Sequence, residues 1–139
     1  MTFKRFAYLD YGGDEPTPSV EVVLHGANGV SEPTRALIDT GSEYSGLPKE
    51  LADELGAPAE LYATEAQGWD GISPRSWWKH GPTVSVMGFE IRLSPLIRVA
   101  LPIVVLGRLD FLVHFRFTVE DANRAFTLEA TDDLIGVAD

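Results

Sequence analysis

Hydrophobic and polar residues alternate along several short stretches of this chain, which is the pattern of half-buried β-strands. The first such stretch covers residues 20–24, and the pair Asn28-Gly29 leads from it into a second apolar run over residues 30–39. An Asn-Gly pair between two apolar runs is a strong signal for a tight hairpin turn. The sequence therefore predicts a hairpin whose second strand ends at Asp39.

Two further hairpins are predicted towards the C-terminus. The first covers residues 84–93 with its turn at Met87-Gly88, and the second covers residues 115–130 with its turn at 121–124. Strands that are this short and this evenly spaced are typical of a small barrel or sandwich. We therefore expect an all-β fold.

Only two short helices are expected. The first covers residues 48–56, because Pro48 suits a first helical turn, acidic residues follow early and Gly56 suits a helix end. The second is a helical turn or two over residues 108–114, directly after Gly107. No repeat or linker separates these elements.

Length and composition narrow the class of protein. The chain has 139 residues, of which 45% are hydrophobic and 23% charged, as in an ordinary globular domain. No apolar run approaches the ~18 residues of a membrane helix, and no secretory signal is recognisable. The absence of cysteine excludes disulfides, thiolate catalysis and cysteine-ligated zinc. We expect one cytoplasmic domain, residues 1–139, whose tail at 131–139 is frayed or contacts a partner chain.

The charge balance argues against a nucleic-acid partner, and the lack of a long apolar run argues against a membrane partner. The formal net charge is −10, whereas binding to phosphates needs a cationic surface. Residues 75–116 are locally basic, with six basic and two acidic side chains. These bases alternate with apolar residues, as solvated outer positions of strands do, so an RNA-binding face is the weaker interpretation.

The chemically informative segment is Asp39-Thr40-Gly41-Ser42, which directly follows an apolar strand. Gly41 allows a sharp bend because it lacks a Cβ, and the hydroxyls of Thr40 and Ser42 can donate hydrogen bonds. Turns of this composition also end strands that have no catalytic role. The triplet alone therefore does not decide between a structural turn and a site.

A second motif lies downstream, where an apolar strand ends in Val105-Leu106-Gly107-Arg108. With the segment Leu37 to Ser42, it resembles the retropepsin-like aspartic proteases, a family of retroviral and related bacterial single-lobe enzymes, and in particular the bacterial single-lobe type. The match to the family pattern covers about residues 20–128. The resemblance implies a small closed acid-protease β-barrel with one or two short helices.

The resemblance also implies the chemistry. In that family two Asp-Thr-Gly loops meet across a two-fold axis, and their carboxyls share a proton and activate a water. This chain has one such triplet, so an aspartic endopeptidase would require a homodimer in which Asp39 of each copy is catalytic. Thr40 would bond across the axis, Gly41 would let the loops approach and Ser42 would bond the outer carboxylate oxygen. No metal or cofactor is implied, and the partners would be a second copy and a peptide or protein substrate.

The resemblance implies two further features, at positions that match the family's pattern. Glu43 and Arg108 are expected to form an ion pair that braces the two loops. The segment around Gly68, Trp69, Asp70, Gly71 and Ile72 is expected to be the tip of a flap hairpin that closes over substrate. The substrate would be selected by apolar pockets, and the residues expected beside these pockets are Leu37, Val104 and Ile72.

Two alternatives stay open. The first is a retropepsin-like domain that binds a peptide or partner without cleaving it, since the apolar and glycine positions of both motifs also serve packing. The second is a small interaction domain of a toxin–antitoxin or secretion system that uses strand edges and its acidic face. A metal site is not expected, because His25, His80 and His114 lie far apart in the sequence.

Overall fold

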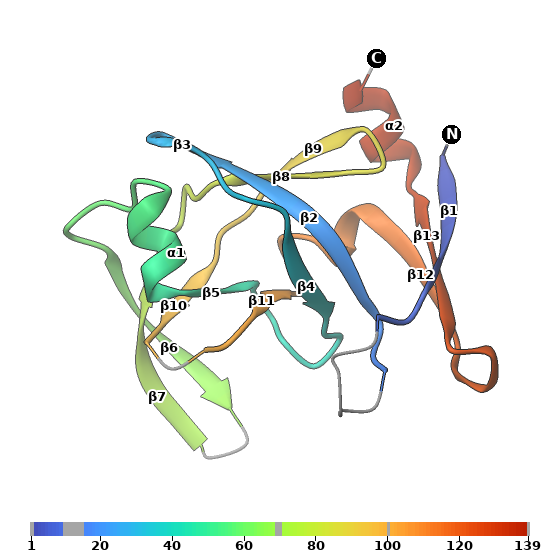
Figure 1. Cartoon of the computed structure of the whole chain (residues 1–139). Helices are drawn as coiled ribbons and strands as arrows, with labels where there is room; N and C mark the ends of the chain where they lie inside the picture. The colour runs from blue at the N-terminus through green and yellow to red at the C-terminus, as the bar shows by residue number, and fades with distance from the viewer. Residues whose placement is uncertain (1, 10–15, 69–70, 100, 139) are drawn as a thin grey trace.

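The computed structural model describes residues 2–9, 16–68, 71–99 and 101–138, and side chains are described outside 63–75 and 136–138. β-strands are the main regular structure of the described chain (Figure 1). The elements, in chain order, are β1 (Phe3–Ala7), β2 (Ser19–Gly26), β3 (Gly29–Val30), β4 (Thr34–Ile38), β5 (Gly46–Pro48), α1 (Lys49–Glu54), β6 (Tyr62–Gly68), β7 (Gly71–Trp77), β8 (Thr83–Val86), β9 (Phe89–Arg92), β10 (Leu96–Arg98), β11 (Val104–Leu106), η1 (Leu112–His114), β12 (Phe115–Glu120), η2 (Asp121–Asn123), β13 (Ala125–Ala130) and α2 (Asp132–Ala138).

The strands form two sheets. The larger follows the order β6-β7-β10-β5-β11-β4-β2-β8-β9, with β3 paired to β2, and the smaller follows the order β1-β13-β12. The larger sheet curls into a half-barrel, which confirms the all-β expectation with short helices (Figure 1). Among the described strands, β9 does not pair back to β6, so hydrogen bonds leave the barrel open between these two ends.

All three predicted hairpins are confirmed. β2 pairs antiparallel with β3 and β4, β8 pairs with β9, and β12 pairs with β13. At the β8–β9 turn Met87 and Gly88 have φ values of 53° and 82°. Positive φ at both central residues is the geometry of the two-residue turns that match the twist of antiparallel strands.

The helices agree with the sequence in part. α1 begins directly after Pro48, and the chain leaves it at Gly56, whose φ is 92°. The predicted helix at 108–114 is a turn followed by the 3-10 helix η1. The tail is α2 instead of a frayed end, because the buried Leu134 holds it on the core. No helix in the described part of the chain is long and apolar enough to cross a membrane.

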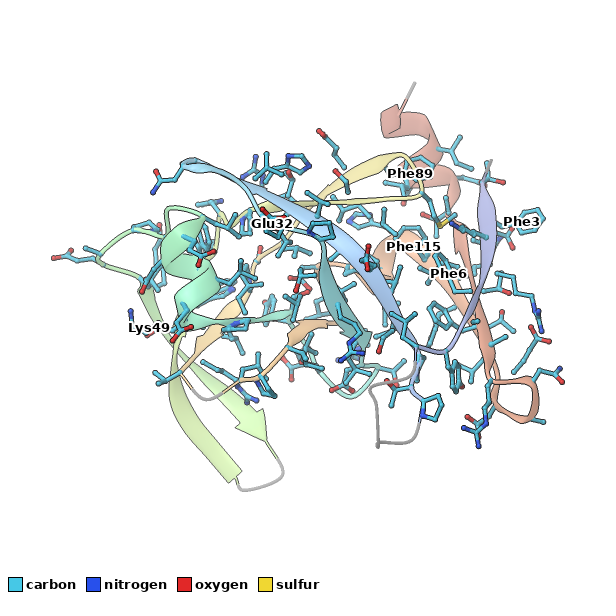
Figure 2. All side chains as sticks on the ribbon, viewed as in Figure 1. Phe3, Phe6, Glu32, Lys49, Phe89 and Phe115 are labelled. Carbon is cyan, nitrogen blue, oxygen red and sulfur yellow. The ribbon has the colours of Figure 1, made fainter. Side chains whose placement is uncertain are left out.

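The core joins the two sheets. Leu24, Leu106 and Phe126 are fully buried, and each contributes roughly 1.5–3 kcal/mol by its burial. The ring of Phe6 on β1 stacks on that of Phe126, with centroids 5.0 Å apart. Figure 2 places Phe6 on the inner side of β1 and Phe3 on the outer side. Ile38 of β4 and Leu106 of β11 are buried in the same core, and these two strands carry the candidate site.

Candidate active site

The two sequence motifs leave the larger sheet side by side. β4 and β11 are parallel neighbours, with Leu37 opposite Val105 and Ile38 opposite Leu106. Since the carboxyl ends of parallel strands meet at the same edge, Asp39 and Gly107 emerge together. The Asp39 backbone N–H donates to the Leu106 carbonyl oxygen at 3.1 Å. Residues far apart in the sequence are thus joined at one point.

Asp39 lies in a tight turn at the surface. The backbone N–H of Gly41 donates to Oδ1 of Asp39 at 2.9 Å, and the N–H of Ser42 donates to the Asp39 carbonyl oxygen at 3.2 Å. The Asp39 side chain is half-buried, and Thr40 and Gly41 are exposed. The turn therefore orients one carboxylate oxygen and leaves the loop surface open to another molecule.

Ser42 does not play the role that the resemblance implies. Its hydroxyl donates to the carbonyl oxygen of Tyr44 at 2.7 Å, not to the carboxylate of Asp39. The turn at 42–44 brings that carbonyl within reach, so the hydroxyl stabilises the loop backbone instead. The cross-axis role of Thr40 involves a second chain and stays a prediction.

The expected ion pair between Glu43 and Arg108 is wrong for this structure. Both side chains are exposed, and neither takes part in a salt bridge within the described residues. The two loops are joined through the backbone, since the N–H groups of Arg108 and Leu109 donate to the carbonyls of Ser42 and Glu43 at 2.8 and 2.7 Å. Two exposed long side chains gain about 0–1 kcal/mol from pairing, so little favours the bridge.

The second motif serves close packing. Leu106 is fully buried, and Gly107 is buried where the backbone of residues 44–45 crosses it. A Cβ on Gly107 would lie 2.3 Å from the carbonyl carbon of Tyr44. Only glycine fits at this crossing, which explains its place in the motif.

A buried carboxylate that the sequence did not single out holds the loops together. Oδ1 of Asp110 accepts hydrogen bonds from the N–H and the hydroxyl of Ser45, both at 3.0 Å, and Oδ2 accepts from the N–H of Ser94 at 2.9 Å. The Ser45 hydroxyl oxygen in turn accepts from the N–H of Gly107 at 3.0 Å. Asp110 therefore performs the bracing expected of the Glu43–Arg108 pair. The signal in the sequence that could have indicated this buried carboxylate is an acidic residue directly before the apolar pair Phe111-Leu112.

Burial raises the pKa of the Asp110 carboxyl, and the hydrogen bonds from Ser94 and Ser45 oppose that rise. A raised pKa in the folded state means that this group stabilises the fold most below the ordinary carboxyl pKa, and that the contribution is lost as pH rises through the raised value. The burial of Asp110 thus makes its contribution to stability most favourable on the acidic side.

We expect Asp110→Asn to lower the free energy of unfolding by about 1–3 kcal/mol. In the wild type both carboxylate oxygens accept hydrogen bonds from backbone N–H groups, whereas the amide N–H₂ of asparagine would place a donor against one of those N–H groups. The loss should be larger at acidic pH than at neutral pH, since the raised pKa of Asp110 stabilises the wild type there. Urea unfolding of both proteins between pH 4 and 8 measures the difference. The control Asp53→Asn, which changes an exposed carboxylate paired with Lys49, should change stability by less than about 0.5 kcal/mol. Equal losses in the two variants would contradict the assigned role.

A small cavity lies beside Asp39. Its volume is about 70 Å³, and its lining includes Tyr44, Leu101 and Val105. The expected pocket neighbour Val104 is wrong, because its side chain is 1% exposed and points into the core. Successive residues of a strand face opposite sides, so Val105 takes the position beside Asp39.

The predicted flap hairpin is present as β6 and β7, which pair from Tyr62 and Trp77 to Gly68 and Gly71. Figure 1 shows this hairpin extending away from the body of the sheet. Trp69 and Asp70 lie outside the described residues, as does the side chain of Ile72. Whether the hairpin closes over substrate stays a prediction.

The base of the hairpin is anchored beside the Asp39 loop. The indole N–H of Trp77 donates to the Ser94 carbonyl oxygen at 2.9 Å, and the ring centroids of Trp77 and Tyr44 are 5.2 Å apart. Trp78 is buried and Trp77 half-buried, as expected for neighbouring strand positions. The base of the hairpin therefore contacts the loop that follows Asp39 through Tyr44.

Comparison with known proteins adds a likeness of fold. No family model matches the chain, and the search among curated proteins finds no match either. Among solved structures the chain is similar to the EIAV protease complexed with the inhibitor HBY-793, with 23% identity and a TM-score of 0.48 over 72% of this chain and 88% of that one. At this identity the similarity concerns the fold alone, and it does not favour the bacterial over the retroviral type.

Proposed function

We propose that this chain is an aspartic endopeptidase of the retropepsin type, active as a homodimer with one Asp39 carboxyl from each copy. The observation that carries the proposal is the place of Asp39, at the surface end of a buried parallel strand pair, in a turn bonded to the second motif. Rigid buried strands below an exposed carboxylate suit a catalytic group that must be held in position.

The chemistry follows from bringing two such carboxyls together. At about 3 Å they cannot both ionise, so the pair holds one proton and titrates as a unit. The ionised member accepts a proton from a water as the water attacks the peptide carbonyl, and the protonated member donates to the carbonyl oxygen. No metal or cofactor enters this scheme. The cavity beside Asp39 would accept a substrate side chain, with Leu101 and Val105 as its apolar walls.

We expect peptide cleavage to be fastest at acidic to mildly acidic pH, because the pair of Asp39 carboxyls must carry one proton. The measurement is kcat/KM for a peptide substrate from pH 3 to 8, with and without a metal chelator. The rate should fall on both sides of its maximum and be unchanged by the chelator. A rate that rises steadily to alkaline pH, or that the chelator abolishes, would contradict the mechanism.

A non-cleaving domain of the same fold is the second candidate. The structural roles of Gly107 and of the Ser45–Asp110 network fit this candidate equally well, because such a barrel needs them whether or not it cleaves. In that case peptide binding would survive Asp39→Asn, and no cleavage would be seen at any pH. The single-domain organisation and the cytoplasmic location stay predictions under either candidate.

A further inference from the structure

Two adjoining cavities lie at the base of the β6–β7 hairpin. The first has a volume of about 450 Å³ and the second of about 530 Å³, and both are lined by Pro58, Trp78 and His80. Neither shares a lining residue with the cavity beside Asp39. Cavities of this size hold small organic molecules, so the pair has room for a ligand that the Asp39 site does not involve.

The first cavity is lined by aromatic rings. Tyr62 at the start of β6 and Trp77 at the end of β7 have ring centroids 6.4 Å apart, and Trp78 also lines the cavity. The ammonium group of Lys79 lies 5.8 Å from the Tyr62 ring centroid and 5.7 Å from that of Trp77, where the rings attract a cation. Flat rings pack well on or against one another, so this cavity suits an aromatic ligand group.

The second cavity is lined by basic residues. His25 on β2 lies opposite Thr83 on β8, which lies opposite Arg92 on β9. Directly opposite residues share a face of the sheet with Cβ atoms about 5 Å apart, so these three side chains form one row. His80, far from His25 in the sequence, lines the same cavity, and no carboxylate of the described residues does. In a chain of net charge −10, this cavity is therefore suited to an anion.

The basic side chains keep donors that the protein does not use. Arg92 donates to the Gly81 carbonyl oxygen at 2.8 Å, which occupies one of the five N–H donors of a guanidinium group. Nε2 of His25 lies 2.9 Å from the Ser85 hydroxyl oxygen, which holds the imidazole ring in place. Neither Arg92 nor Lys79 forms a salt bridge within the described part of the chain. Arginine with unused donors is the residue that best matches the oxygens of a phosphate group.

Trp78 provides a further donor where the two cavities meet. Its side chain is 93% buried, since 7% is exposed, and its indole N–H has no hydrogen-bond partner among the described residues. The N–H is nevertheless accessible, because the sealed side-chain polar atom without a partner in the described structure is Oγ1 of Thr131. A buried indole N–H usually has an acceptor. A ligand in these cavities would supply one to Trp78.

We propose that the two cavities form one binding site for a small aromatic phosphate ester. The ring of the ligand packs against Tyr62 and Trp77 in the first cavity, and its phosphate accepts hydrogen bonds from Arg92 and His80 in the second. The indole N–H of Trp78 donates to an oxygen between these two parts. The site is independent of the proposed function, since none of its residues lines the cavity beside Asp39.

The first test is isothermal titration calorimetry of the full chain with three probes: 1-naphthyl phosphate, 1-naphthol and inorganic phosphate. We expect 1-naphthyl phosphate to bind with a dissociation constant of about 1 mM or tighter. The other two probes should bind at least about tenfold more weakly, because each occupies one cavity and forgoes the contacts of the other. Absence of binding by 1-naphthyl phosphate, or equal binding by inorganic phosphate, would overturn the inference.

The second test is Arg92→Glu, which should weaken binding of 1-naphthyl phosphate at least about tenfold, because it replaces a donor to the phosphate with a repelling charge. The matched control is Arg108→Glu, the same charge change at an exposed arginine that lines neither cavity. Its dissociation constant, and that of Asp39→Asn, should lie within about twofold of the wild type. Equal weakening by Arg92→Glu and Arg108→Glu would indicate a general effect of net charge and overturn the site.

The loss of the bond to the Gly81 carbonyl could unfold Arg92→Glu, which circular dichroism would show. In that event His80→Glu replaces it, because His80 is exposed and lines both cavities. The same weakening of at least about tenfold is expected, and an unchanged dissociation constant in the folded variant overturns the inference. Since Asp39→Asn leaves this binding intact, a failure of the proposed peptidase activity and a failure of this site are told apart.

Discussion

Asp39→Asn is expected to abolish peptidase activity, with kcat/KM lower by at least about 10³-fold, and to leave the fold and the dimer intact. The amide has nearly the size of the carboxyl and can still accept the Gly41 N–H through its oxygen. It cannot take a proton from water or share one with its mate. The measurement is the rate of peptide cleavage at the pH optimum, together with the thermal melting curve.

The matched control for Asp39→Asn is Asp53→Asn, the same change at an exposed carboxylate on α1. Its rate should lie within about twofold of the wild type, because Asp53 is on a helix outside the candidate site. Near-normal cleavage by Asp39→Asn would remove Asp39 from the mechanism. A large loss in both variants would instead indicate a general effect of net charge.

Gly107→Ala is expected to lower the free energy of unfolding by at least about 3 kcal/mol, the upper range for overpacking a buried position. The added Cβ would lie 2.3 Å from the Tyr44 carbonyl carbon and 2.7 Å from the Ser45 nitrogen, both backbone atoms that no side-chain rotation can move away. Relief requires the Asp39 loop and the second motif to separate. Urea unfolding measures the loss, and peptidase activity should fall with it.

The matched control for Gly107→Ala is Gly88→Ala, at the β8–β9 turn. A Cβ there meets nothing within 4 Å, but φ is 82°, so only backbone strain of about 1 kcal/mol is expected. If the two substitutions cost the same, the close crossing at Gly107 is not what requires glycine. A larger cost at Gly107 supports the packing of the two loops as described.

The elements that could be predicted from the sequence are those encoded by local turn chemistry. Gly29 and Gly88 adopt positive φ at little steric cost, so a glycine between two apolar runs marks each of these hairpins without knowledge of the rest of the chain. Pro48 and Gly56 bound α1 in the same way. The parallel pairing of β4 with β11, which brings Asp39 to Leu106, has no local signal. Its expectation came from the resemblance of the two motifs.

The features that were missed depend on contacts between distant residues. Asp110 meets Ser45 across 65 positions of sequence, and nothing at either position alone indicates the other. Residues 103–106 are apolar throughout, so no alternation shows which of them face the core. The sequence therefore could not show that Val105, and not Val104, lines the cavity beside Asp39. The helix α2 is held by the burial of Leu134, a tertiary contact that outweighs the weak helix propensity of Gly136.

The most direct test is an experimental structure of the assembled protein in which the separation of the two Asp39 carboxyl groups is measured. We predict a two-fold dimer whose closest Asp39 oxygens, one from each copy, lie about 3 Å apart, near enough to share a proton. A protein that is monomeric throughout, or a dimer that holds these oxygens more than about 10 Å apart, would contradict the proposed hydrolysis and leave a half-barrel that binds without cleaving.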